Sequence, residues 1–188
     1  FQVAFQAVKV LEREYGLAKG SETALKITLQ PEWNTGAPCP HVISSEEKTF
    51  LIYLAREIDP KWDGTYVTEV DSKSKEAKPL VLIEFKNCYI YKFGGMNEEV
   101  WHGHPLYERG LEGNSAHRIE NSDWLKEQKK INSVHPSYKE EYWSKYNHFM
   151  LLFHDTMFEC LAESYNVEVH RDSFENVVKL AKVRLFGG

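Results

Sequence analysis

Residues 149–169 read FMLLFHDTMFECLAESYNVEV, and this stretch decides the fold class. Two apolar runs, 149–153 and 157–162, flank the short polar segment 154–156, which is the pattern of a β-hairpin. Residues 165–169 then alternate apolar and polar side chains, as a half-buried strand does. Strands joined by short turns pair antiparallel. The stretch therefore predicts an antiparallel sheet.

Similar patterns extend in both directions from this hairpin. Apolar alternation and β-rich runs predict strands at 25–29, 49–56, 65–70, 80–85, 88–93 and 117–120. Only Lys86-Asn87 separates two of these runs, which favours a second hairpin. Helical spacing and N-cap residues predict helices over 2–15 and starting near residues 122, 137 and 172. We therefore expect an α+β fold: a single domain over 1–188, mainly antiparallel β-sheet with several helices packed on it.

The composition is that of an ordinary globular chain. Of the 188 residues, 42% are hydrophobic and 27% are charged, close to the average for globular domains. A length of about 150 residues per domain is typical, which favours one domain over two. The chain starts at Phe1 instead of Met and ends on Gly187-Gly188, so we expect trimmed or fused material.

Charge, apolar patterning and cysteine usage argue against several classes of partner. The formal net charge of −5 provides no basic surface for a phosphate backbone, so nucleic-acid binding is not expected. No run approaches the roughly 18 apolar residues of a membrane span, so no membrane partner is expected. Cys39, Cys88 and Cys160 form no C-x-x-C pair, which predicts reduced, buried thiols in a cytoplasmic protein.

The stretch 94–113 is the strongest candidate for a functional loop. Glycine and proline recur in it too often for a regular helix, and long ordered loops often carry function. Its polar groups are Asn97, Glu98, Glu99, His102 and His104. Two imidazoles on one side of an extended segment can hold a metal, but no third ligand follows at a defined offset. We therefore expect neither a metal nor a cofactor, and the simpler interpretation is that these histidines bond loop carbonyls.

His154-Asp155 is the second candidate for a functional site. A carboxylate beside an imidazole can orient it as a general base. The pair lies between two strand-like runs, however, where an aspartate also satisfies the backbone N–H groups of a turn. Turn chemistry is the interpretation that we favour, and catalysis is the alternative.

About a third of the chain carries a sequence pattern that resembles a known protein family. Its residues are Phe93-Gly94, Asn97-Glu98-Glu99, Gly103-His104-Pro105-Leu106-Tyr107, Gly110-Leu111, Asn121-Ser122-x-Trp124, Ile131-Asn132-Ser133-Val134-His135 and Phe153-His154-Asp155-x-x-Phe158-Glu159. This pattern resembles a family of uncharacterised bacterial proteins. The resemblance implies a bacterial, cytoplasmic origin and implies no activity and no catalytic residue.

Two functional interpretations follow from the sequence. The first is a non-catalytic domain that binds a protein or a small molecule, which rests on the acidic charge, the aromatic fraction of 13% and the lack of a complete catalytic motif. The second is a small hydrolase or lyase with a His/Glu/Asp site in the 97–104 loop and the 154–155 turn. The candidate polar site comprises Asn97, Glu98, His102, His104, His154 and Asp155. Whether the protein forms a homodimer stays open.

Overall fold

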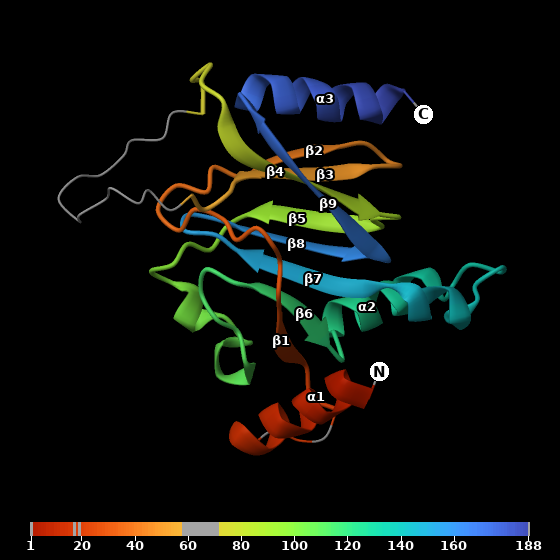
Figure 1. Cartoon of the computed structure of the whole chain (residues 1–188). Helices are drawn as coiled ribbons and strands as arrows, with labels where there is room; N and C mark the ends of the chain where they lie inside the picture. The colour runs from red at the N-terminus through yellow and green to blue at the C-terminus, as the bar shows by residue number, and fades with distance from the viewer. Residues whose placement is uncertain (1, 17, 19, 58–71, 188) are drawn as a thin grey trace. The chain divides into compact units, whose positions relative to one another are not determined.

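The computed structural model describes residues 2–16, 18, 20–57 and 72–187, and it confirms the α+β class (Figure 1). Within these residues there are two antiparallel sheets, and the strands are divided between two compact units. Unit 1 comprises residues 1–28 and 88–164, and unit 2 comprises residues 29–87 and 165–188. A single domain over 1–188 stays a prediction. No helix in the described ranges is both long and apolar enough to cross a membrane.

Unit 1 is built on a five-stranded sheet with the order β1-β6-β7-β8-β5. Its strands are β1 (Thr23–Ile27), β5 (Ile90–Gly94), β6 (Ala116–Glu120), β7 (Asn147–Leu152) and β8 (Met157–Ala162). Its helices are α1 (Gln2–Glu14), α2 (Asp123–Asn132) and the 3₁₀ turns η1 (Trp101–Gly103), η2 (Tyr107–Arg109) and η3 (Glu140–Lys145). The predicted hairpin is confirmed, because β7 and β8 pair antiparallel from Asn147↔Ala162 to Leu152↔Met157.

Unit 2 is built on a four-stranded sheet with the order β2-β3-β4-β9, on which α3 packs. Its elements are β2 (His41–Ser44), β3 (Thr49–Leu54), β4 (Lys78–Lys86), β9 (Ser164–Asp172) and α3 (Phe174–Phe186). Phe174, Val177 and Ala181 of the helix pack against Phe50 and Leu82 of the sheet. The sequence predicts this inner helix face from the spacing of its apolar residues.

The glycine-rich connection from β5 to β6 packs on one face of the unit 1 sheet. Leu106 and Leu111 from the connection share a buried apolar cluster with Ile119, Met150 and Leu152 from β6 and β7. Gly110 has a φ of 90°, and a Cβ atom there would lie 2.5 Å from the carbonyl oxygen of Ala24 on β1. The connection is therefore an ordered layer of the unit and brings its polar residues close to the strands.

The structure corrects the second predicted hairpin. The strands β4 and β5 do not pair, because β4 lies between β3 and β9 and both of its edges are occupied. Instead, β5 pairs with β8, and the N–H of Tyr89 donates to the carbonyl of Leu161 at 2.8 Å. A two-residue spacing is compatible with a hairpin but cannot report which strand edges are already taken.

Smaller corrections concern element ends and faces. The segment after residue 137 forms the 3₁₀ turn η3 and not an α-helix, and β2 lies in a stretch for which the sequence predicts no strand. The helical spacing of Trp124, Leu125, Gln128 and Ile131 predicts that they form the inner face of α2, but Ile131 is 56% exposed. Cys39 and Cys88 are half-buried, whereas Cys160 is buried as expected. The predicted strand 65–70 lies outside the described residues.

Candidate functional site

Three of the predicted site residues meet on the surface of unit 1, and we call Glu98, His154 and Asp155 the surface triad. His154 Nε2 lies 3.0 Å from Glu98 Oε1, and His154 Nδ1 lies 2.8 Å from Asp155 Oδ1. The Glu98 N–H also donates to the His154 carbonyl at 2.9 Å, and the Asn114 amide donates to the other Glu98 oxygen at 3.4 Å. The hairpin turn therefore holds the start of the glycine-rich connection through side-chain and backbone bonds.

The surface triad is arranged as an ion cluster. The hydrogen bond to Asp155 raises the pKa of His154 above its ordinary value of 6.5, and the charge of Glu98 acts in the same direction. Because both ring nitrogens contact carboxylates, His154 can take a substrate proton only if one of those contacts breaks. This geometry fits a structural ion cluster better than general-base catalysis, and among the described residues the Asp155 side chain bonds to the His154 ring and to no backbone N–H group of the turn.

The other predicted residues lie outside the surface triad. Asn97 caps a turn, because its side-chain oxygen accepts the Glu99 N–H at 3.2 Å. His102 is exposed, with its ring centroid 6.4 Å from that of Tyr107. The six predicted residues are therefore not brought together as one site.

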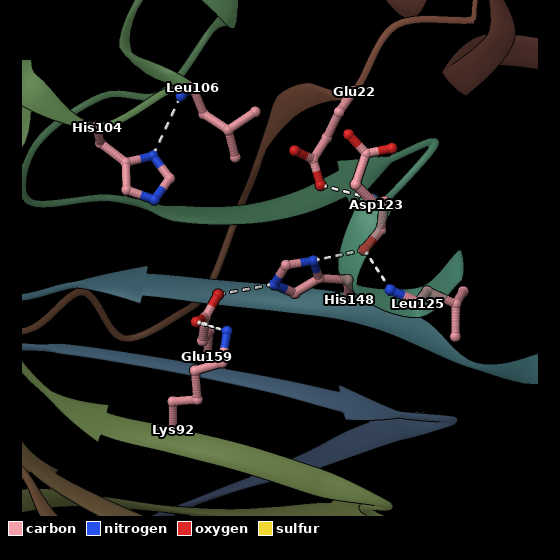
Figure 2. Close-up of polar contacts among 9 residues, drawn as sticks. Glu22, Lys92, His104, Leu106, Asp123, Leu125, His148 and Glu159 are labelled. Atoms are coloured by element: carbon pink, nitrogen blue, oxygen red, sulfur yellow. Dashed lines mark hydrogen bonds and ion pairs between the residues drawn. The ribbon is translucent and has the colours of Figure 1, made fainter. Parts of the chain in front are cut away.

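His104 belongs to a different group of charges. Its Nδ1 accepts the Leu106 N–H at 3.1 Å, so the ring carries its proton on Nε2 when it is neutral. Partial burial lowers the pKa of His104 below 6.5, against the opposing effects of Glu159 and Glu22. His148 and Lys92 also lie close enough to influence this pKa. Figure 2 shows His104 with these neighbours.

The centre of this group is a hydrogen-bonded chain of Ser122, His148 and Glu159, which we call the buried triad. The Ser122 hydroxyl lies 2.9 Å from His148 Nδ1, and His148 Nε2 lies 3.0 Å from Glu159 Oε2 (Figure 2). All three residues are at most 6% exposed. With an ionised Glu159, one arrangement satisfies every atom: Nε2–H donates to the carboxylate, and the hydroxyl donates to Nδ1.

Strand register explains how the buried triad forms. Glu159 of β8 is the Cα partner of Met150 on β7, and His148 lies two residues before Met150, so the two side chains share a face. Lys92 of β5 is the partner of Glu159 on the other side, and its Nζ lies 2.7 Å from Glu159 Oε1. The carboxylate is therefore held between an imidazole and an ammonium group.

The N-terminus of α2 supplies the serine. Asn121 adopts a φ of 54°, a conformation that asparagine tolerates better than most residues, and this turns the chain from β6 into the helix. The Ser122 hydroxyl caps α2 by accepting the Leu125 N–H at 3.0 Å. Glu22 accepts the Asp123 N–H at 2.8 Å, which places a carboxylate at the positive end of the helix.

Hydrogen bonds favour the ionised form of Glu159. Burial alone would raise the pKa of Glu159, but hydrogen bonds from His148 and Lys92 outweigh it and hold the pKa below its usual value. The Lys92 ammonium also lies 3.8 Å from the centre of the Trp124 ring, a cation–π contact. The Trp124 ring in turn meets His148 edge-on at 5.1 Å between centroids. The site is thus a continuous polar network bordered by an aromatic side chain.

Sequence reasoning recognises Ser122 only as a helix cap and does not single out His148 or Glu159. The available signal is a charged residue inside an otherwise apolar run, since Glu159 lies between Phe158 and Cys160. Among the described residues, no group of three or more His, Cys, Asp or Glu side chains could hold a metal ion. Comparisons of the chain with protein-family models, curated proteins and solved structures found no match.

Proposed function

We propose that this protein is a non-catalytic binding domain and that its ligand is a small molecule with a carboxylate group. The observation that supports this proposal is the set of polar groups around the buried triad. The Nε2–H of His104 has no hydrogen-bond partner among the described residues, and Lys92 gives one contact to Glu159 and keeps further N–H donors. Both groups are donors, and one is a cation.

The chemistry of these donors favours an anionic ligand. Hydrogen bonds from an ammonium group to a carboxylate are stronger than those between neutral groups. The Nε2–H of His104 adds a second donor without adding a charge, because burial disfavours the protonated ring. One carboxylate oxygen of Glu22 accepts the Asp123 N–H, and the other can accept a hydrogen bond from a donor on the ligand. An amino acid or a small dicarboxylic acid matches this set of groups.

Titration of the ¹⁵N-labelled protein with L-glutamate, succinate and acetate, followed by NMR, tests the proposal. We expect at least one of them to shift the side-chain signals of His104 in a saturable way. The variant His104→Asn keeps an oxygen to accept the Leu106 N–H but lacks the outer N–H group, so it should bind about tenfold more weakly. The matched control His102→Asn, in the same connection, should bind like the wild type.

Any of three outcomes would overturn the binding proposal. The first is that none of the three carboxylates shifts the His104 signals at millimolar concentration. The second is that His104→Asn binds the ligand as tightly as the wild type. Equal weakening in His102→Asn would also contradict it, because this control lies outside the group of charges around the buried triad.

Hydrolysis is a second candidate function, and one observation favours it. The Ser122–His148–Glu159 chain has the order nucleophile, base and orienting carboxylate that activates serine in hydrolases. The Ser122 hydroxyl, however, is buried and already accepts the Leu125 N–H as the cap of α2. A fluorophosphonate probe decides between the two functions: labelling of Ser122 in the wild type would establish the hydrolase, and no labelling is expected for a binding domain.

We also propose that the protein binds its small-molecule ligand in the cytoplasm of a bacterium. Its three cysteines without a disulfide and the resemblance of residues 93–159 to bacterial proteins support this proposal. Whether the protein forms a homodimer stays open, and light scattering of the purified protein tests this directly by measuring its molar mass in solution.

A further inference from the structure

His117 lies beneath the end of the glycine-rich connection. It belongs to β6, and its side chain is on the same face of that strand as Ile119, against which Leu106 and Leu111 of the connection pack. Nε2 of the His117 ring accepts the Glu112 N–H at 3.1 Å. His117 is 0% exposed. A buried side chain of the sheet therefore satisfies a backbone group of the connection.

This hydrogen bond determines where the ring of His117 carries its proton. A ring nitrogen that accepts a hydrogen bond has no proton, so the neutral ring carries its proton on Nδ1. If the ring takes up a second proton, Nε2 becomes a donor, and it then faces the Glu112 N–H, which is also a donor. The bond is lost, and two donors face each other in a place that water does not reach, which costs free energy.

The surroundings of His117 oppose its protonation. The charged side chains that face it are Lys26, its Cα partner on β1, and Glu112 on the connection, whereas its partner on β7 is the uncharged Met150. Burial has the largest effect and lowers the pKa of His117 from 6.5 to about 4. Lys26 acts in the same direction, and Glu112 and the backbone of Ser115 act against it. The ring is therefore neutral at pH 7.

The start of the connection is attached in a different way. The Glu98 N–H donates to the His154 carbonyl at 2.9 Å, and a bond between two backbone groups does not titrate. The Glu98 carboxylate also lies 3.0 Å from His154 Nε2, and protonation of this exposed ring strengthens their attraction. Acid should therefore weaken the attachment at the end of the connection and not at its start.

We propose that His117 is an acid-sensitive switch, whose protonation detaches residues 112–115 from the sheet while the start of the connection stays attached at His154. The ring is neutral when the segment is attached and regains its ordinary basicity when the segment opens, so opening takes up one proton. Opening therefore becomes about tenfold easier for each pH unit between pH 6.5 and pH 4, and the attachment is fully present above this range. The proposal is independent of the carboxylate-binding function, because neither His117 nor Glu112 belongs to the groups around the buried triad.

Amide hydrogen exchange of the folded chain, followed by NMR and corrected for the intrinsic effect of pH, tests the switch. Between pH 7 and pH 5 the protection of the Glu112 amide should fall about 20-fold, because the open ring is protonated at pH 5 and the attached ring is not. The protection of the Glu98 amide should not fall. At pH 5 the Glu112 amide should also stay less protected than that of the buried Met150. Equal protection of these two amides would mean that residues 112–115 open only when unit 1 unfolds, and would overturn the proposal.

Two variants identify the histidine that responds to pH. His117→Gln keeps an oxygen that can accept the Glu112 N–H but does not titrate, so the 20-fold fall should disappear. His104→Gln removes another histidine whose pKa is lowered by burial, and the fall should remain. Because His117 is in the core, His117→Gln can fail to fold, and the wild type then decides. A His117 ring with its proton on Nε2 at pH 7, a change of less than threefold at Glu112, or loss of the fall in His104→Gln overturns the proposal.

Discussion

Two His–Glu pairs in unit 1 have the same N–O distance but differ in how deeply they are buried. In both pairs the imidazole Nε2 lies 3.0 Å from a glutamate oxygen. The side chains of His148 and Glu159 are 3% and 8% exposed, whereas those of His154 and Glu98 are 35% and 41% exposed. Water screens the exposed pair and replaces a lost partner, but it cannot do so for the buried pair. The two pairs should therefore differ in what they contribute to stability.

Removing one charge from each pair tests this difference. Glu159→Gln leaves His148 and Lys92 without their carboxylate, so the free energy of unfolding should fall by about 3 kcal/mol. The matched change Glu98→Gln should lower it by less than about 1 kcal/mol. Urea denaturation of both variants at pH 7 measures the two values. Equal losses in the two variants would show that burial does not set the strength of these pairs.

At the scale of elements, the glycine-rich connection owes its order to packing and not to regular secondary structure. Its apolar residues Leu106 and Leu111 are 2% exposed, and two 3₁₀ turns are its only helical segments among the described residues. Gly110 lets the backbone approach β1 at a positive φ. The position of His104 beside the buried triad therefore depends on how the whole connection packs on the sheet.

Two glycines of the connection make a matched test of this packing. In Gly110→Ala, the new Cβ atom would lie 2.5 Å from the carbonyl oxygen of Ala24 at a φ of 90°, so stability should fall by more than about 2 kcal/mol. A Cβ atom at Gly103 meets no atom within 4 Å, and Gly103→Ala should change stability by no more than about 0.5 kcal/mol. Thermal denaturation followed by circular dichroism compares the two. A larger effect at Gly103 would argue against an ordered connection.

At the scale of the whole molecule, the chain path links the two units. The chain starts in unit 1, forms most of unit 2, returns to unit 1 at Cys88 and ends in unit 2 after Ser164. Neither unit is one continuous piece of chain, so each loses a part if the other is cut out of the sequence. Sheets assembled from distant segments order only when their loops close, which favours cooperative folding.

A single unfolding transition is the expectation that follows from this path. Three of the five tryptophans, Trp101, Trp124 and Trp143, belong to unit 1 and weight the fluorescence towards that unit, whereas far-ultraviolet circular dichroism reports on both sheets. The two signals should give the same urea midpoint for residues 1–188. Two separated midpoints would instead show that the chain comprises two independently folding domains, contrary to the prediction from length.

Local patterns predicted the class of the fold and most of its elements. The hairpin of β7 and β8, the helix α2 with Ser122 as its cap and the helix α3 follow from alternation, spacing and capping residues, which act over a few positions. The bond between His154 and Asp155 also follows from two adjacent residues. These features need no information from distant parts of the chain.

Only the tertiary structure decided the division into two sheets and the composition of the buried triad. A spacing of two residues between 80–85 and 88–93 cannot show that β4 already has neighbours on both edges. Likewise, Ser122, His148 and Glu159 come from a helix cap and two strands. Strand register and the position of α2 together bring Ser122 within 2.9 Å of His148, and His148 within 3.0 Å of Glu159. Local sequence specifies which way a side chain faces on its own element, whereas long-range packing specifies what it faces.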